Sequence, residues 1–322
     1  MRCLGTPTAS NPSPPQLAWL AALALLVPAW PMDSIAAEPG VAEGPVAAGE
    51  VAFLRLVRDD AGNAVSLDTS IVRYRETAEA AVRAGHREPV EVDLVGAVHL
   101  GSKAYYDTLD RVFRGYDAVL YELVAPDNAR VPKPGRKPAG AIGSAQQGLT
   151  KMLGLEFQLE QIDYGARNFV HADLSPREFE AAMRKRGESW WSMFFKLMKE
   201  GTARAERDAR KGGGDVGFGD LFGLLFGNDR EVRLRRIMAE QFTDMDVLTA
   251  AFGGEEGSSL ITDRNAAALD VLRDQIARGR RRIAIFYGAA HMDDFDERLR
   301  RDFGMEPFET DWLEAWDLRM PK

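Results

Sequence analysis

The sequence contains little cysteine and little histidine. Cys3 is the one cysteine in 322 residues, which excludes a disulfide framework and a thiolate metal cluster. Positive charge is also in the minority: 41 Lys and Arg face 49 Asp and Glu, and the net charge of -8 argues against a broad nucleic-acid-binding surface. Hydrophobic residues at 45% and charged residues at 28% are typical of a soluble globular protein with a core.

Long hydrophobic runs are missing from the chain apart from one segment near its start. The stretch from Leu17 to Trp30 is apolar, follows Arg2 and leads into small residues, a pattern typical of a secretory signal. We therefore expect a signal peptide over residues 1–37, followed by a Gly/Pro/Ala-rich linker over 38–50. With this signal peptide, the chain is expected to be exported to the periplasm or the extracellular space. Cleavage of the signal peptide would leave a mature chain without a membrane span. An uncleaved membrane anchor is the alternative.

From residue 51 to 322 the apolar pattern alternates between strand and helix periods, which predicts one α/β domain. The strand–helix–strand order between Val90 and Val124 is a βαβ unit and predicts parallel pairing of its two strands. Ser102 and Ser175 are expected helix N-caps, the second within a capping box that Glu178 completes. The expected fold class is a mixed, mainly parallel sheet flanked by helices, with a helical insert in the second half.

The insert covers residues 189–252 and carries an aromatic stripe with a glycine-rich break over 212–219. Two interpretations stay open. The insert is either a mobile helical cap over the strand ends, which would select extended apolar substrates, or a set of helices that pack on the sheet and enlarge the core.

Two of the four histidines end near-identical phrases, GAVH at Gly96–His99 and GAAH at Gly288–His291. Each phrase follows an apolar strand. We expect each glycine to permit a tight backbone turn at the end of its strand, and the small residues to leave room beneath the imidazole.

Ionisable residues also follow two other expected strands. Glu122 follows one of them, and His171 with Asp173 follows the other. Parallel strands end at one edge of a sheet, so these residues are expected to converge there with His99 and His291. Two neutral imidazoles and a carboxylate match a Zn²⁺, Mn²⁺ or Co²⁺ site that keeps a position open for water. The candidate metal ligands are His99, Glu122, His291, His171 and Asp173. Without a metal, a histidine oriented by a carboxylate could serve as a general base for water. The alternative without a function is that each histidine is a structural residue whose hydrogen bonds are made within the fold.

Three further residues were considered for the site. Arg264 and Asn265 lie on a predicted helix that runs back toward the last strand. Arg264 is either a surface ion-pair partner or a fixed positive charge near the site. His86 lies before its strand and is expected to be an exposed loop residue.

The chain between Val90 and Gly304 resembles the TraB/PrgY/GumN/TIKI family. The segments that carry the resemblance are the GxxH phrases, VLYEL, DRN and YGAAHMDDFDERLRRDFG. The resemblance implies a fold similar to erythromycin-esterase-like and ChaN-like proteins, and a metal-dependent hydrolase that cleaves peptide bonds or, second, small esters. The chain departs from the family in lacking a C-terminal membrane span and in its long insert. By resemblance the catalytic or metal positions are His99, Glu122 and His291, and the Arg-Asn helix carries Arg264 and Asn265.

A non-catalytic binding module is the rival interpretation. ChaN-like relatives bind haem and pheromone-shutdown relatives intercept a peptide. A haem site needs an exposed axial ligand, for which Tyr105 or Tyr106 are the candidates, although tyrosines of this spacing also pack a helix against a core.

Overall fold

The computed structural model describes residues 51–125, 150–187, 229–243 and 259–320. The predicted signal peptide and linker lie outside these residues. So do the aromatic stripe and the glycine-rich break of the insert, so the cap interpretation is untested by the fold.

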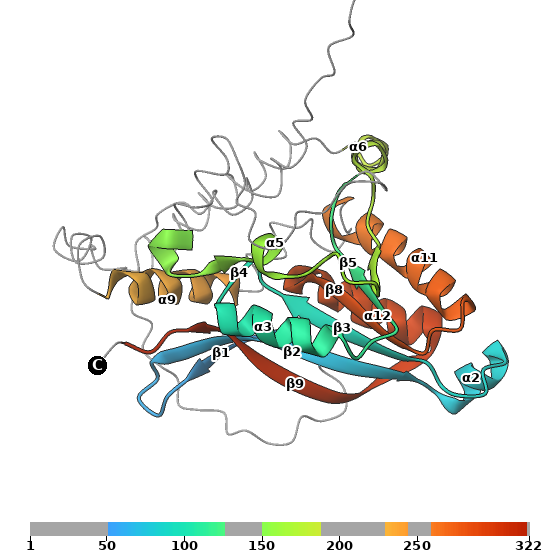
Figure 1. Cartoon of the computed structure of the whole chain (residues 1–322), viewed down its shortest axis with the longest axis horizontal. Helices are drawn as coiled ribbons and strands as arrows, with labels where there is room; N and C mark the ends of the chain where they lie inside the picture. Colours follow the sequence, from blue (N-terminus) through green and yellow to red (C-terminus); the bar gives the residue numbers. More distant parts are fainter. Residues whose placement is uncertain (1–50, 126–149, 188–228, 244–258, 321–322) are drawn as a thin grey trace, which may run out of the picture.

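The described residues form a seven-stranded sheet with the strand order β1-β2-β3-β8-β5-β7, and β9 pairs with β2 (Figure 1). Its strands are β1 Leu54–Arg58, β2 Ala64–Glu76, β3 Glu91–Ala97, β5 Ala118–Tyr121, β7 Phe169–His171, β8 Arg282–Gly288 and β9 Met305–Asp317. The pairs β3–β8, β8–β5 and β5–β7 are parallel, whereas β2 pairs antiparallel with β1, β3 and β9. The predicted mixed, mainly parallel α/β sheet is confirmed.

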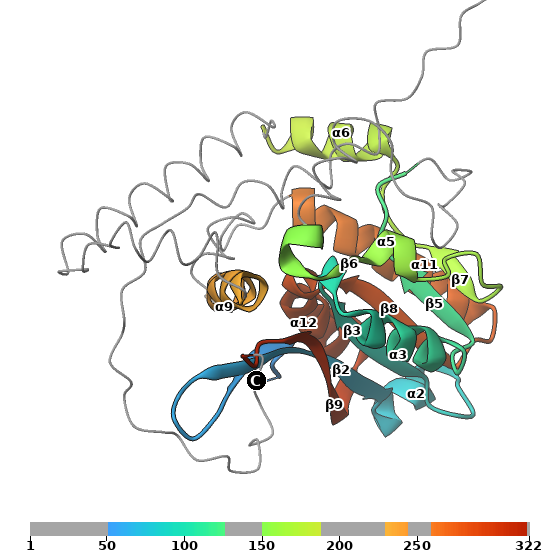
Figure 2. The same ribbon diagram turned by 60° about the vertical axis from the view of Figure 1, so that its left-hand side comes forward.

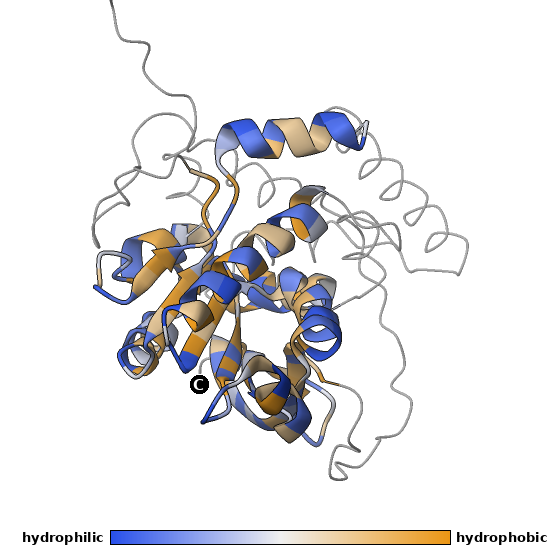
Figure 3. Ribbon diagram, turned by 90° about the vertical axis from the view of Figure 1, so that its right-hand side faces the viewer, coloured by the Kyte–Doolittle hydropathy of each residue, from blue (hydrophilic) through white to orange (hydrophobic). Residues whose placement is uncertain are grey.

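Helices cover both faces of the sheet (Figures 1 and 2). One face carries α3 Lys103–Phe113, and the other carries α11 Arg264–Ala277 and α12 Met292–Phe303. Alternate residues of β3 serve the two cores: Val95 belongs to the cluster under α3, and Leu94 to the cluster under α11 and α12. Colouring by hydropathy shows mostly hydrophobic strands, and helices in which hydrophobic and polar residues alternate (Figure 3).

The order of the central strands corrects one prediction. Strands β3 and β5, which α3 connects, run parallel but are not neighbours, because β8 lies between them and pairs with both. Residues 282–288 therefore insert into a unit formed by residues 91–121. This insertion places the two GxxH phrases on adjacent strands, with Ala97 opposite Gly288.

The remaining elements frame this centre. A second, two-stranded sheet pairs β4 Leu100–Gly101 with β6 Glu156–Phe157, and α5 Gln158–Gln161 follows it directly. The helix α2 Ala78–Ala84 joins β2 to β3, and α6 Pro176–Lys185 follows β7. A π-helix, η2 Ser259–Asp263, leads into α11, and a 3-10 turn, η3 Ala289–His291, leads into α12.

The predicted helix caps are confirmed. The Ser102 side chain accepts a hydrogen bond from the backbone N–H of Tyr105 at the start of α3. Ser175 and Glu178 form the complete capping box at the start of α6. The side-chain oxygen at each cap satisfies a backbone donor that has no partner within the helix.

The helix α9 Arg230–Phe242 is the described part of the predicted insert. Ala239 is fully buried in the core cluster under α3, and the ring of Phe242 meets Trp316 edge-on at 5.6 Å. Arg236 Nε donates to the carbonyl oxygen of Leu318 at 2.7 Å. This part of the insert therefore packs on the sheet and enlarges the core. Within the described ranges, no helix has the length and apolar character needed to cross a membrane.

Candidate active site

The two GxxH phrases and Glu122 meet at Gly288, the last residue of β8. A β-carbon placed on Gly288 would lie 3.4 Å from Glu122 Oε2 and 3.9 Å from both His99 Nε2 and His291 Cδ2. The two imidazole atoms are therefore at most twice that last distance apart. The carboxyl ends of β3, β5 and β8 thus bring His99, Glu122 and His291 together, as expected from parallel strands that end at one edge.

The reason expected for the glycines is wrong. Gly288 has φ -54° and ψ 142°, which any residue adopts, and Gly96 is not in the positive-φ region either. A side chain at Gly288 would fill the centre of the cluster, whereas one at Gly96 would make ordinary van der Waals contact with the backbone oxygens of Phe53 and Ser70 at 3.5 Å. The missing side chain therefore leaves room in the site at Gly288, and nothing in the structure requires a glycine at position 96.

Glu122 is buried and ionised. Its Oε1 accepts a hydrogen bond from Arg264 Nη2 at 2.8 Å, and its Oε2 accepts one from the backbone N–H of Gly288 at 2.8 Å. Burial acts to raise the pKa of Glu122, but Arg264, followed by His291, His99 and the Gly288 N–H, overrides it and holds the pKa well below its usual range. The site therefore contains a permanent negative charge.

Arg264 is the fixed positive charge that compensates Glu122. It is 4% exposed, and it binds Asp173 as well, with Nε 2.9 Å from Oδ1 and Nη2 2.5 Å from Oδ2. Burial acts to lower the pKa of Arg264, yet the two carboxylates raise it above its usual value. Of the two interpretations of Arg264, the surface ion pair is wrong. Asp173, an expected metal ligand, is instead the second anchor of this guanidinium.

His291 is buried at the start of α12 and is neutral. Its Nδ1 lies 2.6 Å from Asn265 Oδ1, and its Nε2 lies 3.6 Å from Glu122 Oε1. Burial lowers the pKa of His291 to about 3, although Glu122 acts to raise it. The sequence placed Asn265 on a nearby helix; the structure brings its amide into contact with the imidazole.

His99 is the exposed member of the cluster. It lies between β3 and β4, and its backbone oxygen accepts a hydrogen bond from the N–H of Gln158 at 2.9 Å, which ties this loop to α5. The deeper residues Glu122 and His291 are 9% and 5% exposed. A substrate would therefore reach the cluster from the side of His99.

Two histidines lie elsewhere. The ring of His171 packs edge-on against Tyr121, with centroids 5.7 Å apart, and its Nε2 lies 2.6 Å from the carbonyl oxygen of Leu123. The structure therefore does not bring His171 into the cluster. His86 is half-buried, not exposed as expected, and its Nδ1 pairs with Glu76 at 2.9 Å.

The tyrosines considered as haem ligands are core residues. Tyr105 and Tyr106 are 2% and 0% exposed. The hydroxyl of Tyr105 lies 3.0 Å from Thr69 Oγ1, and that of Tyr106 donates to the carbonyl oxygen of Val98 at 3.0 Å. Neither hydroxyl is presented to a cofactor, so the structural interpretation of both tyrosines is the right one.

The donor set of the cluster suits a divalent metal in chemical type. Imidazole nitrogens and a carboxylate bind Mn²⁺, Co²⁺ and Zn²⁺, and neither His99 Nε2 nor His291 Nε2 has a hydrogen bond to a described residue. Glu122 would share its charge between the ion and Arg264. Among the described residues, no three His, Cys, Asp or Glu side chains are grouped closely enough to hold an ion. Binding would require the imidazoles and Glu122 to draw together.

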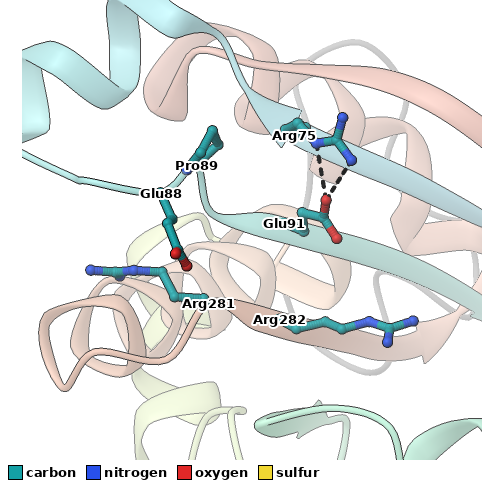
Figure 4. Close-up of a pocket in the computed structure, with 6 residues that line it drawn as sticks. All are labelled: Arg75, Glu88, Pro89, Glu91, Arg281 and Arg282. Carbon is teal, nitrogen blue, oxygen red and sulfur yellow. Dashed lines mark hydrogen bonds and ion pairs between the residues drawn. The ribbon is translucent and has the colours of Figure 1, made fainter.

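A pocket of about 460 Å³ lies at the opposite edge of the sheet (Figure 4). Glu91 and Arg282, which line it, begin β3 and β8, so it opens at the amino ends of the parallel strands. Arg75 binds Glu91 at 2.6 Å, while Arg281 and Arg282 extend in opposite directions. This pocket shares no residue with the cluster.

No family model matches the chain, and no curated protein or solved structure matches it. The likeness to the TraB/PrgY/GumN/TIKI family therefore rests on the motifs and on their order along the chain.

Proposed function

We propose that the chain is a metal-dependent hydrolase that activates water between His99, Glu122 and His291 and cleaves peptide bonds, with small esters as the second substrate class. The observation that carries the proposal is the 3.6 Å separation between Nε2 of a neutral, buried His291 and Oε1 of an ionised Glu122. Two groups that accept hydrogen bonds face each other there. Such a pair suits a water molecule or a cation between them.

Two charged groups act on a water molecule at this place. Arg264 keeps Glu122 ionised, and the Glu122 charge stabilises positive charge that develops on His291. A base with a pKa of about 3 is too weak to deprotonate ordinary water efficiently near neutral pH. His99, His291 and Glu122 would hold a divalent ion, and such an ion would supply a Lewis acid that lowers the pKa of bound water toward 7. The weak basicity of His291 is the reason that the proposal includes a metal.

The protein residues have separable roles. His99, on the exposed side, faces the incoming substrate, and Glu122 and His291 lie beneath it. The absence of a side chain at Gly288 leaves room for the reacting carbonyl group at their meeting point. The choice of peptides over other carbonyl compounds follows from the family resemblance.

The test is cleavage of a peptide library by the full chain, purified without chelator or metal-affinity tag and analysed for bound metal first. We expect products by mass spectrometry in the presence of Mn²⁺, Co²⁺ or Zn²⁺ and loss of cleavage after chelation. A His291→Gln variant whose circular dichroism matches the wild type should lose most of the activity. Binding of peptides without cleavage under every metal condition would instead favour the non-catalytic binding module. A Soret band on titration with haemin would favour its haem-binding form.

Export is proposed on the sequence alone. The segment Leu17 to Trp30 directs the chain out of the cytoplasm, so the N-terminus of the native protein is expected near Ala37 or Glu38. N-terminal sequencing tests this. Recovery of an intact Met1 or Arg2 from the cytoplasmic fraction would contradict it.

A further inference from the structure

We propose that Asn265 and Asp294 act as positioning residues that fix His291 in one tautomer, with the hydrogen on Nδ1 and a bare Nε2 directed at Glu122. The importance of this tautomer for catalysis rests on the proposed function. Its existence does not, because it follows from hydrogen bonds alone.

The orientation of the Asn265 amide is set first. Its Nδ2 donates to the backbone carbonyl oxygen of His291 at 3.0 Å and to Asp294 Oδ2 at 2.8 Å. A backbone carbonyl has no hydrogen to donate, and Asp294 is paired with Arg298 Nε at 2.9 Å, as a carboxylate would be. Both partners require a donor, so the NH₂ group must face them.

The Asn265 oxygen then faces His291. Oδ1 lies 2.6 Å from His291 Nδ1, and an amide oxygen only accepts. Nδ1 must therefore carry the hydrogen. A neutral imidazole has one N–H, so Nε2 is left with a free lone pair.

The reverse arrangement is strongly disfavoured. A flipped amide would point its oxygen at the oxygens of His291 and Asp294, so two good contacts would become repulsive. Its NH₂ group could still donate to an unprotonated Nδ1, so the reverse arrangement keeps one of the three contacts and loses two. A bare Nε2 is the form of imidazole that accepts a proton or binds a metal, so the hydrogen-bond partners of Nδ1 decide whether His291 can do either.

The arrangement assigns a different task to each of two consecutive residues of α11. Arg264 holds Glu122, while Asn265 holds His291. Asp294 completes the chain from the first turn of α12, three residues after the histidine it controls. The first turns of α11 and α12 thus orient both deep members of the cluster.

The test reads the tautomer directly. The chain has only four histidines, so ¹⁵N labelling of histidine gives a long-range ¹H–¹⁵N spectrum with four imidazoles, and His291 is assigned from His291→Gln. For chelator-treated full chain at pH 7 we expect a protonated nitrogen at Nδ1 and an unprotonated one at Nε2. An Nε2–H tautomer, or a roughly equal mixture, in the wild-type chain would overturn the proposal.

Asp294→Asn supplies the second arm, because an amide at 294 can also donate and so removes one of the two constraints on Asn265, while the carbonyl oxygen of His291 remains. We expect the Nε2–H form of His291 to become populated, and kcat on a cleaved peptide to fall roughly tenfold or more. Asp293→Asn, at the exposed neighbouring position, is the matched control and should change neither. An Asp294→Asn spectrum identical to that of the wild type would overturn the role of Asp294.

The two failures are distinguishable. The expected tautomer in a chain that cleaves no peptide leaves the positioning network standing and removes the hydrolase. Cleavage by a chain whose His291 carries its hydrogen on Nε2 leaves the hydrolase standing and removes the network.

Discussion

The guanidinium of Arg264 binds the carboxylate of Glu122, 142 residues away in the sequence, with Nη2 2.8 Å from Oε1. Since the same guanidinium binds Asp173, one buried cation holds two buried carboxylates. Glu122 therefore stays ionised in a place where burial alone would protonate it.

Replacing Arg264 should be costly because it leaves two unpaired carboxylates inside the protein. For Arg264→Met we expect a loss of about 3–5 kcal/mol in the free energy of unfolding, measured by urea denaturation. Arg184→Met, which removes an exposed i,i+4 pair with Glu180, is the control and should cost less than about 1 kcal/mol. Equal losses in the two variants would show that Arg264 is not the buried counter-charge described.

The two glycines offer a matched pair of substitutions. Gly288→Ala places a methyl group 3.4 Å from Glu122 Oε2 without backbone strain, so we expect a nearly unchanged Tm and a loss of hydrolysis of at least tenfold. Gly96→Ala places its methyl group against Phe53, Ser70 and Met292, so hydrolysis should persist whatever the change in Tm. If Gly288→Ala hydrolyses peptides at the wild-type rate, the reacting group does not lie above Gly288.

His171 is one of the predicted metal ligands but is not part of the observed cluster, so a variant at this position distinguishes the two sets of residues. His171→Gln keeps an Nε2 donor for the Leu123 carbonyl oxygen, so we expect wild-type metal content and wild-type hydrolysis. His99→Gln should reduce both. The metal content of each purified variant, measured by plasma mass spectrometry, checks this. Loss of metal from His171→Gln would place that histidine back in the site.

Much of the fold and part of the site could be predicted from the sequence, because both depend on local patterns. Apolar runs predict the strands, and the rule that parallel strands end at one edge brings His99, Glu122 and His291 together. Ser102 and Ser175 act as caps for reasons that lie within one helical turn.

Apart from the expected turn at the glycines, the errors concern relationships between distant segments. The local pattern of apolar and polar residues does not encode that β8 inserts between β3 and β5. The face of the sheet on which His171 lies depends on the pairing of β7 with β5. Nor does the local pattern encode that Asp173 meets Arg264, or that Asn265 meets His291. The adjacent DRN signal marked Arg264 and Asn265 as candidates, but only the packing of α11 against the strand ends assigns each its partner.

Stability should depend on pH through His291. Because its pKa of about 3 in the fold lies below its usual 6.5, the unfolded chain takes up the proton first as the pH falls, and the free energy of unfolding decreases below pH 6.5. Glu122, whose pKa is also lowered, stabilises the fold above its usual value of 4.5 and loses that effect only below it. Between pH 6.5 and 4.5 the wild type should thus lose stability relative to His291→Asn, by up to about 1.4 kcal/mol per pH unit. The free energy of unfolding of both proteins is measured by urea denaturation at several pH values in this range. The same change with pH in the two proteins would contradict a buried neutral His291.

The central claim is that the two GxxH histidines serve one reaction. A double-mutant cycle of kcat/KM on the peptide that the wild type cleaves best, with His99→Gln, His291→Gln and the double variant, tests it most directly. We expect each single variant to lose most of the activity and the double variant to be little worse than either, since residues that act as a unit are not additive. Losses that multiply in the double variant would show that His99 and His291 act independently, and would contradict the account.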